Sequence, residues 1–169
     1  MLDAFSSPVP SADAALVAAL LAVDPAGLGG VALRAPAGPL RDAWLTLLRD
    51  GLPASTPMHR VPLHATDSAL LGGLDLAATL HAGRPVAQQG LLARCDGGVL
   101  LLAMAERVSA GVASQLAAVL DTQVVALERD GLTQRRPARV ALVALDEGDG
   151  DEEQMPATLL DRVAFHLPL

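Results

Sequence analysis

The sequence predicts an α/β domain built on a mostly parallel sheet. Short apolar runs that fit buried strands alternate along the chain with longer segments of helical spacing. Two of the runs, 99–102 and 140–145, are apolar throughout, which is typical of strands covered on both faces. With 169 residues and 51% hydrophobic content, the chain is long enough for one domain with a sizeable core.

Capping and helix-stopping residues delimit the elements of the first half. Ser11 or Asp13 can cap the first helix, and Asp24-Pro25 ends it. Gly72-Gly73 interrupts the third helical pattern, and Gly83-Arg84-Pro85 ends it. The expected elements are, in order, a helix over 14–23, a strand over 30–33, a helix over 41–49, a strand near 58–64 and a broken helix over 70–80.

The second half continues the same alternation. A Gly-Gly turn leads into the apolar strand over 99–102, and an amphipathic helix follows from Ser109 to Leu120. Asp130-Gly131 between two β-rich runs predicts a hairpin. The remaining elements are hairpin strands over 124–128 and 132–135, a strand over 140–145, an acidic loop over 146–153, a short helix over 157–162 and a strand over 163–167.

Composition excludes several classes of function. The net charge of −7 argues against a general nucleic-acid-binding surface. The longest apolar run, 14–23, is too short to span a bilayer. Cys95 is the single cysteine, so no intrachain disulfide can form and we expect a cytoplasmic protein. All 12 basic residues are Arg, and Lys, Asn and Tyr are absent.

The strand, loop and helix over 30–49 have the layout of a phosphate-binding loop, but its chemistry is missing. Such a loop, G-x-x-x-x-G-K-[ST], holds phosphates with backbone N–H groups and a Lys. Here Pro39 removes a backbone donor, and Leu40 stands in place of the Lys. We expect Arg41 to be a helix-start arginine in solvent, with a phosphate contact as the alternative. The degenerate loop consists of Arg34, Ala35, Pro36, Ala37, Gly38, Pro39, Leu40 and Arg41.

Acidic residues that could hold Mg²⁺ are also out of place. The strand over 99–102 runs into Ala103 and Met104, where nucleotide-hydrolysing domains usually carry acids. Asp146-Glu147 at the end of the other apolar strand is the rival site, although a solvated acidic loop is the simpler interpretation. We expect no bound metal, and we expect Cys95 to be a packing residue.

Six short motifs occur in an order that points to one family. They are Val23-Asp-Pro25, Gly29-Gly-Val31, Leu71-Gly-Gly-Leu-Asp75, Gly90-Leu-Leu-Ala-Arg94, Arg136-Pro-Ala-Arg139 and Leu159-Leu-Asp-Arg162. Together they resemble the AAA+ module shared by the I and D subunits of magnesium chelatase, over nearly the whole chain. The resemblance implies an AAA+ core with a mostly parallel five-stranded sheet, and β-hairpin insertions near 72–92 and 124–135.

The resemblance also assigns positions within the site. Ala103 and Met104 fall where the family carries its Mg²⁺-binding Asp-Glu, and Glu147 falls near its sensor Asn. Both phosphate loop and acidic strand end are intact in the I subunit, so their loss points to the D subunit. A D subunit continues into a helical lid, an acidic linker and an integrin-I-like domain, and we therefore expect residues 1–169 to be an N-terminal fragment.

The function implied is that of a non-hydrolysing AAA+ domain. It would assemble with ATPase I subunits to drive ATP-dependent Mg²⁺ insertion into protoporphyrin IX, on a separate H subunit, in (bacterio)chlorophyll synthesis. The domain itself would bind neither nucleotide nor metal. Arg162 resembles the family's arginine finger, which stabilises charge on a neighbouring subunit's γ-phosphate.

Three alternatives remain open from the sequence. Arg162 could pair with Asp161 or cap its own short helix. The domain could be a pure scaffold that places no residue in any active site. It could also be a divergent, weak nucleotide binder that uses Arg41 and Asp146.

Overall fold

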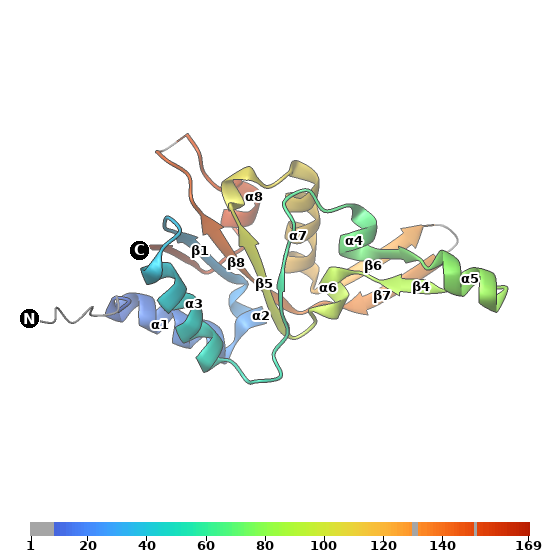
Figure 1. Ribbon diagram of the computed structural model, residues 1–169, viewed down its shortest axis with the longest axis horizontal. Helices are drawn as coiled ribbons and strands as arrows, with labels where there is room; N and C mark the ends of the chain where they lie inside the picture. Colours follow the sequence, from blue (N-terminus) through green and yellow to red (C-terminus); the bar gives the residue numbers. More distant parts are fainter. Residues whose placement is uncertain (1–8, 130–131, 151) are drawn as a thin grey trace, which may run out of the picture.

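Five parallel strands form the central sheet of the computed structural model, which describes residues 9–129, 132–150 and 152–169 (Figure 1). Their order across the sheet is β2-β5-β8-β1-β9. The strands are β1 (Gly30–Arg34), β2 (Met58–Arg60), β5 (Gly98–Ala103), β8 (Val140–Asp146) and β9 (Phe165–Pro168). The predicted α/β class and five-stranded parallel sheet are confirmed.

Helices cover both faces of the sheet. On β8, which is buried along its whole length, alternate residues enter two separate hydrophobic clusters. One cluster includes residues of α1 (Ala12–Val23) and α3 (Pro39–Gly51), and the other includes residues of α7 (Ala110–Thr122) and α8 (Ala157–Leu160). These helices lie on opposite sides of the strands in Figure 1. The fully apolar strand pattern therefore reflects burial from both sides.

Several element boundaries follow directly from capping side chains. The Ser11 hydroxyl accepts a hydrogen bond from the Ala14 N–H at the start of α1, and Ser109 does the same for Val112 at the start of α7. Asp24 ends α1 and caps the one-turn helix α2 (Pro25–Leu28). A 3₁₀ turn, η1 (Ala105–Arg107), and a one-turn helix, α6 (Leu91–Arg94), flank β5.

Two β-hairpins lie side by side and project from one end of the domain (Figure 1). The predicted hairpin is β6 (Val124–Arg129) paired with β7 (Leu132–Pro137), and its Asp130-Gly131 turn lies outside the described residues. The second pairs β3 (Gly72–Leu74) with β4 (Ala87–Gln89), and its connection holds α5 (Leu76–Ala82).

The expected broken helix over 70–80 is wrong, because a strand replaces its middle. Helix α4 (Asp67–Leu71) ends where the chain enters β3. Gly72 has φ +102°, and a Cβ there would lie 2.4 Å from the Gln88 carbonyl oxygen of the paired strand. Only glycine allows this close approach, so Gly72-Gly73 marks a hairpin rather than a helix interruption.

Among the helices of the described residues, none combines the length and the apolar character that crossing a membrane requires.

Candidate functional site

The degenerate phosphate loop lies at the carboxyl edge of the sheet, where the strand order reverses. The chain leaves β1, crosses to the far edge at β2, and later returns to place β8 and β9 on either side of β1. Ligands of open parallel sheets bind at this kind of switch point. The ends of β1, β5 and β8 bring residues 34–41, 103–106 and 146–147 to the same edge.

The loop from β1 to α3 is short and poor in free backbone donors. Its four residues are 35–38, and α3 begins at Pro39. The Ala35 N–H donates to the Asp146 carbonyl at 3.1 Å, and Pro36 and Pro39 have no N–H. Ala37 and Gly38 keep their N–H groups, and the first turn of α3 adds those of Leu40 and Arg41, so the two prolines remove two of the backbone donors that a phosphate-binding loop would use.

Arg41 is not in solvent, and that expectation is corrected. Its Nη1 lies 2.6 Å from Oε1 of Glu147, and only 12% of the Arg41 side chain is exposed. Glu147, the residue at the expected sensor position, is 27% exposed, and its N–H donates to the Glu106 carboxylate at 3.1 Å. Arg41 and Glu147 thus neutralise each other across 106 residues of chain, so the cation in the first turn of α3 is already paired with an internal anion.

Replacing Glu147 should therefore destabilise the domain. Glu147→Gln leaves the largely buried Arg41 charge without its carboxylate, which should cost about 2 kcal/mol. For a domain of this size that corresponds to a melting temperature lower by roughly 4–8 °C, measurable by circular dichroism. Glu152→Gln, on an exposed residue of the same acidic segment, is the matched control and should leave the melting temperature unchanged. Equal melting temperatures for both variants would contradict the pairing.

The end of β5 carries no ligand for Mg²⁺. Ala103 is buried, and Met104 is exposed in a left-handed conformation with φ +51°. The acid nearest this strand end is Glu106 in η1, whose carboxylate receives the Glu147 N–H and lies 3.4 Å from Arg107 Nε. The sequence did not predict Glu106 as a residue of this site, because it lies beyond the end of β5 and only the turn of η1 brings it back to the carboxyl edge of the sheet. Within the described ranges, no three His, Cys, Asp or Glu side chains are grouped as a metal site would need.

The rival site at the end of β8 is also occupied from within. Asp146 is buried rather than solvated, and its two carboxylate oxygens accept the N–H groups of Gly148 and Met155. The Arg34 side chain donates to the carbonyls of Gly148 and Gly150. The side chains of Asp146 and Arg34 thus hydrogen-bond the backbone of the segment that follows β8 and hold it against the edge of the sheet.

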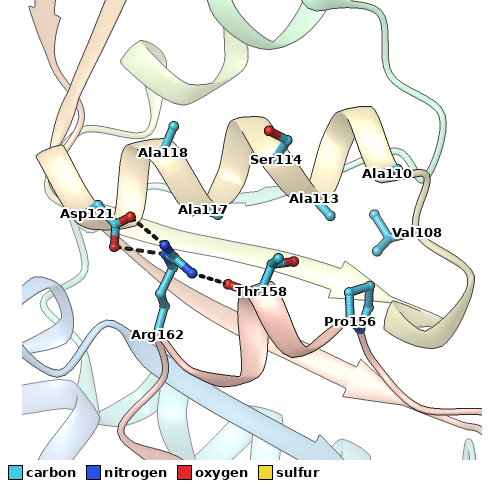
Figure 2. A pocket seen from close by; sticks show the side chains of 10 residues that line it. All are labelled: Val108, Ala110, Ala113, Ser114, Ala117, Ala118, Asp121, Pro156, Thr158 and Arg162. Atoms are coloured by element: carbon cyan, nitrogen blue, oxygen red, sulfur yellow. Dashed lines mark hydrogen bonds and ion pairs between the residues drawn. The ribbon is translucent and has the colours of Figure 1, made fainter.

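Arg162 lies apart from this edge, in the pocket between α7 and α8 (Figure 2). Its Nε and Nη2 donate to the two carboxylate oxygens of Asp121 at 2.8 and 2.6 Å, and its Nη1 donates to the Thr158 carbonyl at 2.6 Å. The helix-capping alternative is thus present through Thr158, but the ion-pair partner is Asp121 and not Asp161. The pKa of the Arg162 guanidinium is raised by its hydrogen bonds to Asp121.

Cys95 lies before the start of β5, away from the carboxyl edge, whereas His166 on β9 lines a pocket with Arg34 and Asp146. Cys95 is fully buried, and burial raises the pKa of its thiol to about 11, as suits a packing residue. His59 lies on β2 and His64 beyond its end.

A scan against protein-family models finds no match. Comparison with curated proteins finds magnesium-chelatase subunits. The chain is 45% identical over 150 residues to the 60 kDa subunit of Cereibacter sphaeroides, and 35% identical over 149 residues to the 67 kDa subunit of Chlorobaculum parvum. The matches cover 89% and 88% of this chain but only 23% and 24% of those proteins, so the chain spans about a quarter of their length.

Two further comparisons extend the same relationship. The 38 kDa magnesium-chelatase subunit of Rhodobacter capsulatus is 30% identical over 189 residues, covering 94% of this chain and 53% of that subunit. Among solved structures, the chain superposes on a structure of the complex between the BchI and BchD subunits of magnesium chelatase. The TM-score is 0.72 at 26% identity, over 96% of this chain and 60% of that one.

The sheet, the hairpin insertions and these relatives all agree with the resemblance drawn from the six motifs. The chain belongs to the magnesium-chelatase subunit family, as an AAA+ domain of the D type that includes the 60 and 67 kDa subunits.

Proposed function

We propose that this chain is the non-hydrolysing AAA+ domain of a cytoplasmic magnesium-chelatase D subunit, and that it assembles with ATPase-active I subunits. ATP hydrolysis in that assembly drives insertion of Mg²⁺ into protoporphyrin IX on the H subunit, in (bacterio)chlorophyll synthesis. The reaction is an ATP-dependent ligation that forms nitrogen–metal bonds. ATP and Mg²⁺ are bound by the other subunits, and this domain supplies contact surface and Arg162.

The proposal rests on the edge of the sheet where phosphate would bind, because the charged groups there are already paired with other groups of this chain. The loop lacks a Lys and two N–H groups, and Arg41 is paired with Glu147 at 2.6 Å. Asp146, Glu147 and Glu106 lie at the same edge and already accept hydrogen bonds or ion pairs from groups of this chain. A nucleotide would have to displace these internal partners to bind here, which favours a neighbouring subunit as the site of ATP hydrolysis.

Two findings support the choice of partner. The match to the 38 kDa subunit covers 94% of this chain and 53% of that subunit, which supports two AAA+ modules similar enough in shape to assemble as like subunits of a ring. The structure that superposes on the chain is that of a complex between two different magnesium-chelatase subunits.

The assembly is tested by mixing this chain with a 38 kDa-type subunit and ATP–Mg²⁺. Light scattering after size-exclusion chromatography should detect a mixed species, and the rate of ATP hydrolysis should change with the amount of chain added until it saturates. Two separate species at all ratios, with an ATPase rate that does not respond to the chain, would contradict the proposed partnership.

A further inference from the structure

The side chain of Arg162 is fixed by three hydrogen bonds from two different helices. Asp121, in the last turn of α7, accepts from Nε and Nη2 in a bidentate arrangement, and Thr158 of α8 accepts from Nη1. Bidentate pairing with a carboxylate sets the plane of a guanidinium as well as its position. Figure 2 shows the guanidinium held between the two helices at one end of their shared pocket.

The backbone of Arg162 is equally constrained. Its N–H donates to the Leu159 carbonyl, and the next residues continue into β9 through the bond from the Ala164 N–H to the Leu28 carbonyl. A Cβ on Gly29 would lie 2.3 Å from the Arg162 carbonyl oxygen, so the glycine allows α2 to pack directly on this turn. The Cα of Arg162 is thus anchored to the sheet, and the remaining freedom of the residue is that of its side chain.

Asp121 and Thr158 leave part of the guanidinium available. An arginine has five N–H donors, and three are used by the partners found in the described residues. One donor remains on each terminal nitrogen, Nη1 and Nη2. Each of these N–H groups can donate to an oxygen of a phosphate.

The surroundings let an incoming group reach those donors. The Arg162 side chain is 30% exposed, and the pocket between α7 and α8 has a volume of about 520 Å³. Its α7 wall is lined by small side chains, among them Ala113, Ala117 and Ala118. An oxyanion can approach without displacing a large residue or breaking the pair with Asp121.

The contribution of the pair to folding is small. Asp121 is 50% exposed and Arg162 30%, and ion pairs exposed to this degree contribute little to stability. The more distinctive consequence of the pair is geometric, because a long Arg side chain would otherwise sample many rotamers.

We propose that Asp121 is a positioning residue that orients Arg162, so that its two remaining N–H donors meet a phosphate of the nucleotide on a neighbouring subunit. This inference rests on the proposed function, in which Arg162 acts in trans. The alternative geometry, in which Asp121 holds Arg162 away from its target, predicts the opposite effect of removing the carboxylate.

Asp121→Asn tests the inference in the mixed complex with a 38 kDa-type ATPase. The complex should keep its melting temperature, and the chain concentration that gives the half-maximal change in ATPase rate should stay the same. The kcat for ATP hydrolysis should fall about tenfold to a hundredfold, as expected when a residue that orients a catalytic group is lost. Asp121→Glu keeps a carboxylate and should restore part of the rate. Asp96→Asn is the matched control, because Asp96 makes the same bidentate contact with Arg139, and neither residue lines this pocket. It should leave kcat unchanged.

A double-mutant cycle separates positioning from a structural role. In an Arg162→Ala background, Asp121→Asn should have no further effect on kcat, because the residue it orients is gone. An undiminished effect in that background would overturn the inference, as would a kcat that rises or stays constant in the single variant. If Arg162→Ala alone leaves kcat unchanged, the trans role of Arg162 fails, and the positioning role fails with it. If Arg162→Ala lowers kcat but Asp121→Asn leaves it unchanged, the trans role of Arg162 stands and only the positioning role of Asp121 is wrong.

Discussion

Arg162→Ala should abolish most of the ATP hydrolysis at interfaces where this chain faces a nucleotide-bearing neighbour. An arginine finger supplied in trans accelerates phosphoryl transfer by about 10³-fold or more, because it neutralises charge that develops in the transition state. The variant should fold normally, since it loses an exposed pair with Asp121 and one cap of α8. Single-turnover hydrolysis of ATP by the assembled complex measures the effect.

Arg162→Lys sharpens this test. Lysine keeps the charge but loses the planar fork, so it should not restore the rate. Arg139→Ala removes an arginine from a similar exposed pair with Asp96 and should have no effect. If Arg162→Ala complexes assemble and hydrolyse ATP at the original rate, the domain is a scaffold that places no residue in an active site.

Trp44→Ala should produce the largest loss of stability. Trp44 is fully buried in the cluster between α1, α3 and the sheet, and its indole N–H donates to the Ala14 carbonyl at 2.8 Å. Truncation of a buried Trp costs about 3–5 kcal/mol, which lowers the melting temperature by roughly 6–20 °C in a domain of this size. Calorimetry or circular dichroism provides the measurement, because Trp44 is the single tryptophan and its fluorescence is lost.

Trp44→Phe is the informative companion variant. It keeps an aromatic ring and loses the hydrogen bond, so its cost should be about half that of the alanine variant or less. A Trp44→Ala protein with a melting temperature within a degree or two of the original would contradict the view that α1 and α3 are joined through this side chain.

The sheet was predictable because burial on both faces leaves a clear pattern in the sequence. The runs 99–102 and 140–145 are apolar throughout and became β5 and β8, two of the three interior strands. The β3–β4 hairpin was not predictable in the same way. Strands of three residues, one of them containing Gly72-Gly73, carry no periodic signal, and their pairing depends on a close backbone contact between distant segments.

The candidate site likewise has features that the sequence predicts and features that it does not. Loss of the loop's Lys and of its backbone donors can be derived from the residues alone, since neither Leu40 nor Pro39 can supply them. By contrast, the ion-pair partners of the remaining arginines cannot be derived from the sequence alone. Arg41 meets Glu147 across 106 residues, and Arg162 meets Asp121 across 41. Which acid faces which arginine follows from the strand order and from the packing of α7 on α8, which the local sequence does not encode.

The central claim is that this domain has lost its own nucleotide site, and calorimetric titration with ATP and Mg²⁺ tests it most directly. A 38 kDa-type subunit, titrated under the same conditions, provides the positive control. We expect no measurable heat of binding to this chain at high micromolar protein, with either ATP or ADP. Saturable, Mg²⁺-dependent binding would contradict the claim, and would make the loop over 34–41 a working phosphate site in which Arg41 exchanges Glu147 for a phosphate.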